Sequence, residues 1–365
     1  MRAIRLKHAS VAIPFRTAFA HASAKRRRAE NILVQVADAD GRVGYGEGCP
    51  RAYVTGETVE TARAFLDRQH DALLDIDGLD ALHGWLSRHA ADIDRNPSAA
   101  CAAELALLDL LSRQQGQSLE RFLGLPDGAD LPPVTAVYGI TSGPVFALQR
   151  VRFVLNGMTD AKLKLGGRPD EARRAAALAR IGRLRLDANN LWSDADSAIA
   201  GLARLAPSAW AVEESVSAHD WPGLRQVADE TGLRIILDES LNDAADFQSV
   251  AGDARFVLNL RVSRLGGVIR TLALVETARS HGHDLIIGAQ VGETSLLARA
   301  GILAAVAAGP ALAATELGYG LQLLRYDLVA PSLTFGRGGR LDPPPPNPGT
   351  GLQPTPALQA AFADR

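Results

Sequence analysis

The sequence predicts an α/β protein in which a parallel barrel follows a separate α+β domain. The barrel is predicted by one repeated pattern. From about residue 130, a short apolar run typical of a strand alternates with an Ala/Leu/Arg-rich segment of helical periodicity, and the strand-like run occurs eight times in about 190 residues. The separate domain is predicted by a change of pattern, because the residues before about 128 read as a few strands followed by one long helical region.

The eight strand-like runs have the spacing of a barrel, with one helix between each run and the next. They are residues 135–140, 161–165, 184–188, 210–213, 235–238, 256–260, 285–288 and 312–316. A doubly wound open sheet is the alternative, and such a sheet carries a glycine-rich phosphate-binding turn before a helix. The segment Gly44-Tyr45-Gly46-Glu47-Gly48 lacks that spacing and a following helix, so we interpret it as a turn and favour the barrel.

The N-terminal domain is predicted from two features. Residues 32–37 and 43–45 alternate between apolar and polar side chains on either side of Asp40-Gly41, which is a hairpin signal. A helical region then extends from about Val59 to Phe122. The C-terminal tail contains the run Pro343–Pro346, which is typical of a stiff extended segment.

Composition excludes several classes of function. With 39 Lys and Arg against 41 Asp and Glu, the formal net charge of −2 gives no basic field for binding nucleic acid or a membrane surface. Neither an apolar run of about 18 residues nor the apolar core of a signal peptide is present in the sequence. The two cysteines, Cys49 and Cys101, cannot build a disulfide framework. We therefore expect a soluble, cytoplasmic protein that binds neither nucleic acid nor membrane.

Lysine is rare in this chain, which has 35 arginines and only four lysines. Two of the four, Lys162 and Lys164, lie at the end of one predicted strand, where residues two apart share a face and can both point into the barrel mouth. Arginine keeps its charge at neutral pH, whereas a desolvated ammonium group can release a proton. Taken alone, the pair favours a strand with two solvated lysines, and a role in proton transfer, which arginine performs badly, is the alternative.

Three consecutive predicted strands each end in a carboxylate. Asp187, Glu213 and Asp238 are separated by 26 and 25 residues, which places them side by side on the barrel rim. Three neighbouring carboxylates repel one another unless a proton or a cation neutralises them, and an oxygen-only set suits Mg²⁺. One such acid could simply cap the helix that follows it. Three acids in register beside Lys162 and Lys164 favour a metal site.

With these motifs the chain resembles the enolase superfamily, and within it the muconate-lactonizing (muconate cycloisomerase) and mandelate racemase-like enzymes. The resemblance covers essentially the whole chain. It rests on Lys162-Leu163-Lys164, Asp187-Ala188-Asn189, Glu213, Asp238-Glu239-Ser240, the strand-six segment 259–267, Thr315-Glu316-Leu317, and residues 44–51 and 55–58 of the first domain.

The resemblance implies a (β/α)7β barrel beneath an α+β capping domain. Residues 1–128 would form the N-terminal part of the capping domain, residues 129–325 the barrel, and residues 326–365 a segment that returns to the capping domain. It also implies one Mg²⁺ bound by Asp187, Glu213 and Asp238, a small carboxylate substrate and a homo-oligomer. A lysine base that works together with Mg²⁺ is a recurring arrangement in this superfamily.

The reaction implied by the resemblance begins with removal of a proton α to the substrate carboxylate, which gives a metal-stabilised enediolate. Lys164 would be the base, and the positive charges of the metal and Lys162 would disfavour its protonated form. The muconate-lactonizing group usually has lysine on strand six, where this chain has Arg261. Because arginine is a poor acid–base group, Arg261 would instead stabilise negative charge.

A single base favours cycloisomerisation or syn-elimination, so we expect a muconate cycloisomerase-like isomerase or lyase. A racemase or epimerase of an N-substituted amino acid or dipeptide is one alternative, and a non-catalytic metal-binding homologue is another. Residues 50–58 also resemble dipeptide epimerases, but those enzymes carry a pair of Asp residues after strand eight to hold the substrate ammonium. This chain has Glu316-Leu317-Gly318-Tyr319 there, which disfavours a dipeptide with a free amino terminus.

Specificity is predicted to come from two loops of the capping domain, residues 15–28 and 49–55, which would close over the barrel mouth. The residues predicted to bind substrate or to support the residues that do are Phe19, Arg26 and Tyr53 in these loops, and Asn189, Glu239, Glu293 and Glu316 at strand ends. We expect Glu239 to pair with Arg261, and Glu293 to orient the substrate.

Overall fold

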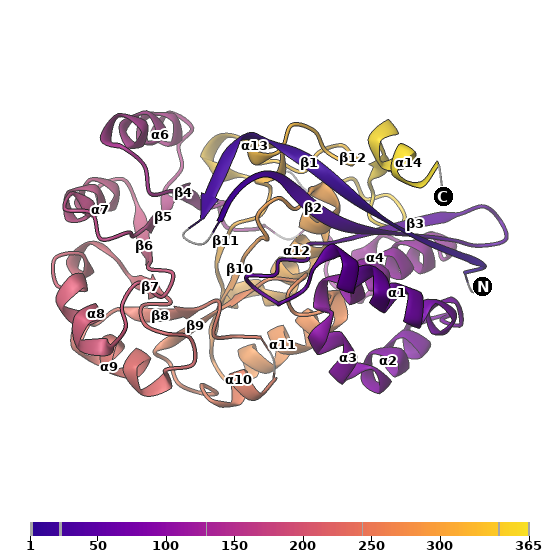
Figure 1. The fold of residues 1–365 in the computed structure, drawn as a ribbon, viewed down its shortest axis with the longest axis horizontal. Helices are drawn as coiled ribbons and strands as arrows, with labels where there is room; N and C mark the ends of the chain where they lie inside the picture. Colours follow the sequence, from indigo (N-terminus) through magenta and orange to yellow (C-terminus); the bar gives the residue numbers. More distant parts are fainter. Residues whose placement is uncertain (1–2, 22–23, 129, 243, 342–343, 364–365) are drawn as a thin grey trace.

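The protein, seen in a computed structural model, contains an eight-stranded parallel sheet and a three-stranded antiparallel sheet (Figure 1). The structure describes residues 3–21, 24–128, 130–242, 244–341 and 344–363, and it describes the side chains of these residues except for 17–26 and 244. No helix among the described residues is both long enough and apolar enough to cross a membrane.

The parallel sheet closes into the barrel predicted from the sequence. Its strands, in spatial as well as chain order, are β4 (Ala136–Tyr138), β5 (Asp160–Lys164), β6 (Arg183–Asp187), β7 (Ala211–Glu213), β8 (Arg234–Leu237), β9 (Phe256–Leu260), β10 (Asp284–Ile287) and β11 (Leu312–Thr315). The barrel closes where the backbone N–H of Thr135 donates to the carbonyl oxygen of Thr315 over 2.9 Å. Each predicted strand agrees with the observed one to within two residues at either end.

Helices surround the barrel, and each connects the end of one strand to the start of the next, as right-handed crossovers of parallel strands require. They are α6 (Gly143–Leu155), α7 (Glu171–Ala179), α8 (Ala195–Leu202), α9 (Trp221–Thr231), α10 (Ala244–Gln248), α11 (Val268–Ser280) and α12 (Ser295–Ala308). This connectivity brings the carboxyl ends of all eight strands to one rim, where the residues that follow the strands meet.

The antiparallel sheet contains β1 (Arg5–His21), β2 (Ala24–Ala37) and β3 (Val43–Gly48) (Figure 1). The hairpin predicted around Asp40-Gly41 is confirmed, and it joins β2 to β3. The loop predicted for residues 15–28 is wrong, because β1 and β2 continue to pair up to His21 and Ala24, past an irregularity between Pro14 and Phe19. Residues 25–28 form a basic run, and such a run is typical of a solvated surface segment. Strand pairing uses only backbone groups, so these residues can still belong to a strand.

The segment Gly44–Gly48 is a strand, not the turn expected from its glycines. Gly44, Gly46 and Gly48 all lie on the face of β3 that packs against α4 (Pro97–Gln114). A Cβ atom at any of the three would overlap a backbone carbonyl oxygen of α4; at Gly46 this is the oxygen of Ala102. Glycine is therefore needed here for the close approach of a helix to a strand rather than for a reversal of the chain.

The remaining helices complete the domain that carries the antiparallel sheet. Besides α4 they are α1 (Val59–Leu74), α2 (Leu79–Arg88), α3 (Ala90–Arg95) and α5 (Leu119–Phe122), which fulfil the predicted helical region. The C-terminal helix α14 (Pro356–Ala363) also packs against β1, and the rings of Phe362 and Tyr45 lie 6.2 Å apart. Between the barrel and α14 lie the short elements α13 (Gly320–Leu323), β12 (Val329–Ala330) and β13 (Gln353–Pro354).

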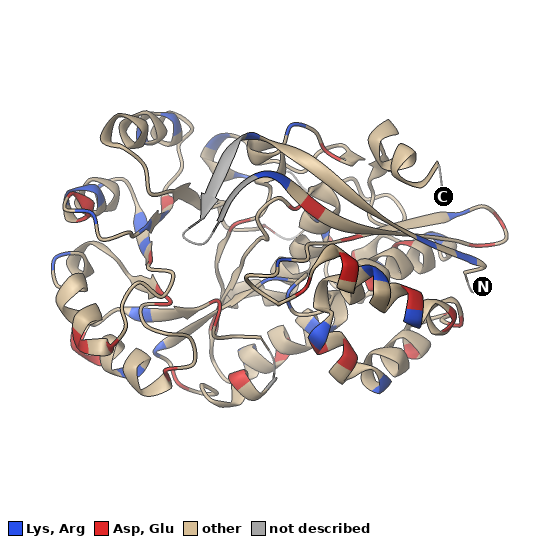
Figure 2. Cartoon of the chain, in the orientation of Figure 1, with Lys and Arg blue, Asp and Glu red and all other residues tan. Residues whose placement is uncertain are grey.

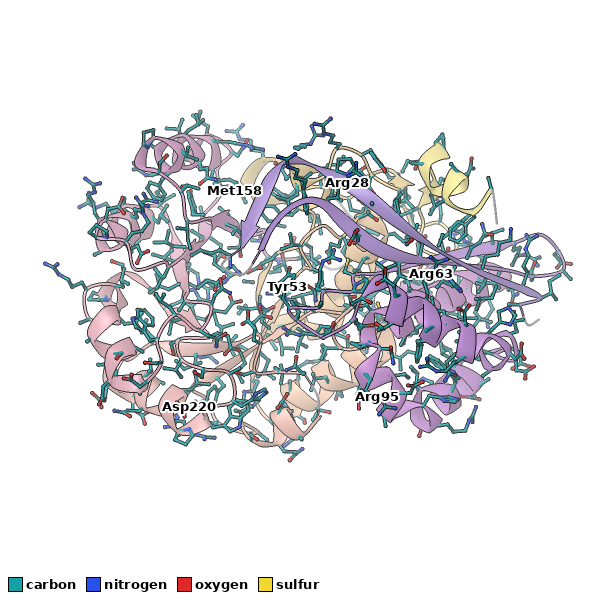
Figure 3. The ribbon with its side chains drawn as sticks, in the orientation of Figure 1. Arg28, Tyr53, Arg63, Arg95, Met158 and Asp220 are labelled. Atoms are coloured by element: carbon teal, nitrogen blue, oxygen red, sulfur yellow. The ribbon has the colours of Figure 1, made fainter. Side chains whose placement is uncertain are left out.

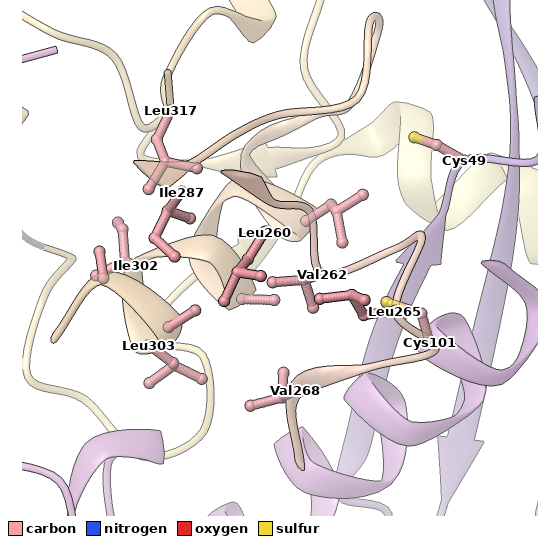
Figure 4. Packing of buried hydrophobic residues seen from close by; sticks show 14 of the residues in the cluster. Cys49, Cys101, Leu260, Val262, Leu265, Val268, Ile287, Ile302, Leu303 and Leu317 are labelled. Carbon is pink, nitrogen blue, oxygen red and sulfur yellow. The ribbon is translucent and has the colours of Figure 1, made fainter. Parts of the chain in front are cut away.

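One hydrophobic core runs through both parts of the molecule. Figure 4 shows the place where they meet: Cys49 and Cys101 face the loop after β9, which carries Val262 and Leu265. All four side chains are buried, and both cysteines are free thiols. The two parts therefore share apolar surface whose exposure to water would oppose their separation.

Two buried carboxylates of the first domain bind the amino termini of two barrel helices. Glu104, on α4, accepts hydrogen bonds from the backbone N–H groups of Val268 and Ile269, the latter at 2.9 Å, at the start of α11. Glu47, on β3, accepts bonds from the backbone and hydroxyl of Thr294, the N-cap of α12. Each carboxylate pairs N–H groups that a helix cannot pair itself, and its charge is favourable at the positive end of the helix dipole.

We expect Glu104 to make stability depend on pH. Burial raises the pKa of Glu104 to about 7, from a usual value of 4.5. Between these two values Glu104 binds its proton more tightly in the folded chain than in the unfolded chain, so its contribution to the free energy of unfolding falls as pH rises from about 4.5 to about 7 and is constant above that. The Glu104→Gln variant should lack this part of the fall, which amounts to at most about 3 kcal/mol.

The measurement is urea-induced unfolding from pH 5 to pH 8 of the unmodified protein and of the Glu104→Gln variant. Glu276→Gln changes an exposed carboxylate on α11, the helix whose start contacts Glu104, and should leave the pH profile unchanged. Parallel profiles for the unmodified protein and Glu104→Gln would show that Glu104 does not take up a proton in this range.

Candidate active site

The barrel rim brings together the residues that the sequence predicted for chemistry. Strand register sets Lys164 of β5 beside Asp187 of β6, and Asp187 beside Glu213 of β7. Asp238 follows β8, and Arg261 follows β9. These side chains are connected by ion pairs, so the rim is a single network of alternating acids and bases.

Lys162 is the buried centre of this network, with a side chain only 3% exposed. Its Nζ atom lies 2.7 Å from Glu316 Oε1, 3.3 Å from Glu213 Oε2 and 3.4 Å from Asp187 Oδ2. Burial alone would lower the pKa of Lys162, but the surrounding carboxylates, above all Glu213 and Glu316, raise it. Lys162 is therefore a permanent positive charge at neutral pH.

Lys164 is the lysine that solvent can reach, with a side chain 22% exposed. Its Nζ atom donates hydrogen bonds to Asp187 Oδ2 at 2.8 Å and to Asn189 Oδ1 at 2.7 Å. Although burial acts to raise the pKa of Asp187, Lys164 and Lys162 outweigh burial and lower it to about 2. Asp187 is therefore ionised at neutral pH and can only accept hydrogen bonds there.

Asp238 lies between two arginines. Arg261 and Arg264 each form an ion pair with one of its carboxylate oxygens. Burial alone would lower the pKa of Arg261, but Asp238 and Glu213 raise it, so Arg261 keeps its charge. The expected pairing of Glu239 with Arg261 is not what the structure has, because Arg261 binds Asp238 and Glu239 accepts a hydrogen bond from Asn189 at 3.4 Å.

The carboxylates at the rim contact cationic side chains rather than one another. Lys162 lies between Asp187 and Glu213, and Arg261 contacts both Asp238 and, at 3.9 Å, Glu213. Among the described residues, no three His, Cys, Asp or Glu side chains form a group that could hold a metal ion. The three acids nevertheless offer only oxygen donors, and the buried Asp187 Oδ1 atom has no hydrogen-bond partner among the described residues. This donor set suits a hard divalent cation.

Burial raises the pKa of two acids at the rim, Glu293 and Glu213. Burial raises the pKa of Glu293 to about 8; its Oε2 atom accepts from the backbone N–H of Gln290, and its Oε1 atom has no partner within the described part of the chain. Burial likewise raises the pKa of Glu213, to well above its usual range. Glu316 is the opposite case, because Lys162 and Arg185 overcome the effect of burial and lower its pKa.

Arg185 is a part of the network that sequence reasoning missed. It is fully buried on β6, and its guanidinium binds Glu316 at 2.6 Å and Asp160 at 2.9 Å. The available signal was its position two residues before Asp187, which places both side chains on the same face of the strand. A buried cation beside Lys162 explains how Glu316 keeps its charge without water.

Of the three residues predicted in the capping loops, Tyr53 is the one whose side chain the structure describes. Tyr53 is 36% exposed in the segment between β3 and α1, and Figure 3 shows it between the antiparallel sheet and the barrel. Its neighbour Arg51 is buried and binds the backbone of Val291 and the side chain of Asn31, each at 2.8 Å, which joins this segment to the loop after β10. The side chains of Phe19 and Arg26 lie outside the described residues.

Curated relatives of this chain are epimerases and racemases of amino-acid derivatives. A hydrophobic dipeptide epimerase from Enterococcus faecalis is 29% identical over 92% of this chain and 90% of the relative. Another from Roseobacter litoralis is 32% identical over 74% of this chain and 78% of the relative. An N-succinyl-L-Arg/Lys racemase from Bacillus cereus is 23% identical over 80% of each.

Solved structures share the fold over nearly the whole chain. A dipeptide epimerase from Methylococcus capsulatus, complexed with Mg and the dipeptide L-Arg-D-Lys, matches with a TM-score of 0.85 and 26% identity, covering 96% of this chain and 99% of that one. Muconate lactonizing enzyme matches with a TM-score of 0.84 at 23% identity over 99% of both chains, which shows a common fold and no more. The comparisons thus support epimerase and racemase relatives better than a cycloisomerase.

Two family models match the chain. Residues 2–124 match the N-terminal domain of mandelate racemase and muconate lactonizing enzymes, and residues 147–358 match the enolase C-terminal domain-like family. Together they cover the antiparallel sheet with its helices and the barrel from α6 onward, including the rim of lysines and carboxylates, but not β4. The protein therefore belongs to the enolase superfamily, in the group of mandelate racemase and muconate lactonizing enzymes.

Proposed function

We propose that the protein is an epimerase or racemase that removes the α-proton of an N-substituted amino acid, with Lys164 as the base. The observation that carries this proposal is the position of Lys164, which is the more exposed of two lysines at a rim of buried charges. The relatives named dipeptide epimerase and N-succinyl-L-Arg/Lys racemase support the same class of substrate.

The chemistry requires a base and a means of holding negative charge. An α-proton beside a carboxylate is very weakly acidic, and its removal places a second negative charge on that group as an enediolate. Lys164 must give up its own proton before it can accept another, and Asp187 and Asn189 fix the direction of its Nζ atom through two hydrogen bonds. Lys162 and Arg261 remain positively charged nearby and would oppose the accumulation of negative charge.

We propose Asp187, Glu213 and Asp238 as the ligands of one Mg²⁺. Their oxygen-only donor set and the Asp187 Oδ1 atom that lacks a partner among the described residues support this assignment, as does the Mg in the solved Methylococcus capsulatus relative. When bound, the ion supplies positive charge next to the substrate carboxylate, where charge develops. Asn189 and Glu239 are then proposed to orient Lys164 and the ligand set, because Asn189 hydrogen-bonds both Lys164 and Glu239.

The substrate is proposed to carry an acylated nitrogen rather than a free ammonium group. After β11 the chain presents Glu316, but Lys162 and Arg185 already neutralise its carboxylate. Tyr319 donates its hydroxyl to the carbonyl oxygen of Thr135 at 2.6 Å, so it is also occupied. Neither residue therefore offers an unpaired carboxylate to a substrate ammonium group. An amide nitrogen carries no charge and does not need such a partner.

A second candidate is one-base chemistry, either cycloisomerisation or syn-elimination. Arg261 favours it, because the pKa of this guanidinium is raised by its carboxylate partners and an epimerase needs proton transfer on both faces of the α-carbon. A non-catalytic homologue would bind metal and exchange no proton. Solvent exchange and stereochemistry separate all three.

We expect Mg²⁺ to stabilise the folded chain, because it would bind only the native arrangement of the three acids. At a Mg²⁺ concentration a hundred times the dissociation constant, the gain in the free energy of unfolding is about 3 kcal/mol. Thermal melts with Mg²⁺ and with excess chelator measure this gain. Asp238→Asn should abolish it, whereas Asp284→Asn, at the other end of a barrel strand, should preserve it. An equal effect of chelator on both variants would refute the ligand assignment.

We expect Lys164→Ala to lose nearly all exchange of the substrate α-proton with solvent. A general base typically contributes about 10²–10⁴-fold, and Lys164→Arg should be almost as damaging because arginine keeps its charge. Deuterium incorporation from D₂O into a panel of N-acyl amino acids and dipeptides, followed by NMR, measures the rate. Lys7→Ala, in the antiparallel sheet, is the control. Exchange that persists in Lys164→Ala would assign the base to another group.

The stereochemical course should depend on Arg261. We expect the unmodified protein to invert the α-carbon measurably but more slowly than it exchanges the proton, because guanidinium is a poor proton donor. Arg261→Lys should raise the ratio of inversion to exchange, and Arg261→Met should lower it. Polarimetry run in parallel with the NMR assay gives both rates. Exchange without any inversion in the unmodified protein would replace the epimerase by the one-base candidate.

A further inference from the structure

The outer surface of α6 is apolar. Val145, Leu148, Val151 and Leu155 recur at the three- and four-residue spacing of one helix face, and Leu148 and Leu155 are 71% and 77% exposed. Val154 extends this surface, and we call these five residues the α6 stripe. The described residues contain ten large hydrophobic side chains that are exposed, and the α6 stripe accounts for five of them.

The orientation of α6 is fixed by packing on its inner face, so the stripe is not a misplaced core. Phe146 and Phe153 are buried, and their rings lie 5.5 Å and 5.2 Å from the ring of Tyr138 on β4. Other barrel helices present polar groups to solvent: the exposed residues of α9 include Gln226, Asp229 and Glu230. Exposed apolar side chains of this number mark an interaction surface.

The area of the stripe is comparable to what a stable dimer needs. Covering the five side chains would remove roughly 500 Å² from water on each chain, against about 800 Å² per partner in a standard interface. Surfaces next to the helix need to contribute only the remainder. In Figure 1, α6 lies at the edge of the molecule, away from α1–α4, so a partner there leaves those helices uncovered.

The charges of α6 favour a second copy of the same chain as the partner. Around a two-fold axis each residue near the centre meets its own equivalent, so a charged centre would be repelled. The sequence of α6 contains Arg150 and Arg152 and no acidic residue, and Figure 2 shows blue but no red on this helix. Both arginines are exposed, and the guanidinium of Arg152, which lies beside Leu148 and Leu155, donates a 2.5 Å hydrogen bond to Gln322 of its own chain.

We propose that the α6 stripe is the contact surface of a homodimer, in which α6 packs against α6 of a second copy around a two-fold axis. This proposal is independent of the reaction, because no residue of the stripe belongs to the rim network. It predicts a dimer whose formation depends on apolar side chains and is therefore insensitive to moderate salt.

Analytical ultracentrifugation over the micromolar range tests the proposal on the full chain. The unmodified protein should sediment as a dimer. The double variant Leu148→Glu/Leu155→Glu should dissociate at least about 100-fold more readily, because it removes apolar contacts and brings like charges together. Ile4→Glu changes an equally exposed apolar residue outside the stripe and should remain dimeric. Circular dichroism and the melting temperature confirm that the double variant is folded, since both leucines point to solvent in the monomer.

A mixing experiment tests the two-fold arrangement. Leu148→Glu and Leu148→Lys should each be monomeric alone, and mixing them should restore a dimer that contains one chain of each kind. A monomeric unmodified protein would overturn the proposal, as would a folded double variant that stays dimeric. Failure of the two single variants to recombine would overturn the isologous contact.

Discussion

The hydrogen bonds that Glu104 and Glu47 accept from the starts of α11 and α12 are the constraint on which the candidate active site depends. These two carboxylates belong to the domain of the antiparallel sheet, whereas the helices belong to the barrel. The loop that precedes α11 carries Arg261, and the loop that precedes α12 carries Glu293. Gly267 lies directly before α11 at φ +130, and a Cβ atom there would overlap Glu104, so the contact tolerates no larger residue. The neighbouring domain thus fixes the positions of two loops of the candidate site, the loop before α11 and the loop before α12.

The two lysines of β5 illustrate how residues with the same side chain can differ in chemistry. Lys162 is surrounded by three carboxylates and is buried, whereas Lys164 has one carboxylate and one amide as partners and contacts solvent. A group that must exchange protons cannot also be the neutralising charge of several acids, because losing its proton would leave those acids unpaired. Arg185 and Arg264 support this division, since each holds one rim carboxylate by a charge that does not titrate.

The barrel and the residues at its rim could be predicted from the sequence because a repeat carries the information. Eight similar units fix the register, so Asp187, Glu213 and Asp238 follow from spacing alone. The contacts between these acids and Arg185 or Arg264 could not be predicted, since they depend on which rotamers fill a shared interior. The segment Gly44–Gly48 was misinterpreted for a related reason: glycine permits both a turn and a close approach, and only the position of α4 distinguishes the two. The long β1–β2 pair was missed because charged residues mask strand periodicity.

The three glycines of β3 have a mechanical consequence beyond their own strand. Because α4 rests directly on them, its height above the sheet is fixed by backbone contact rather than by side chains that could repack. The same helix carries Glu104, whose carboxylate reaches the barrel only if α4 lies at that height. A methyl group added at Gly46 would therefore push α4 away from the sheet and withdraw the Glu104 carboxylate from the start of α11. The loop after β9 would be disturbed as a result. An alteration in the antiparallel sheet would thus reach the rim of the barrel through two rigid contacts.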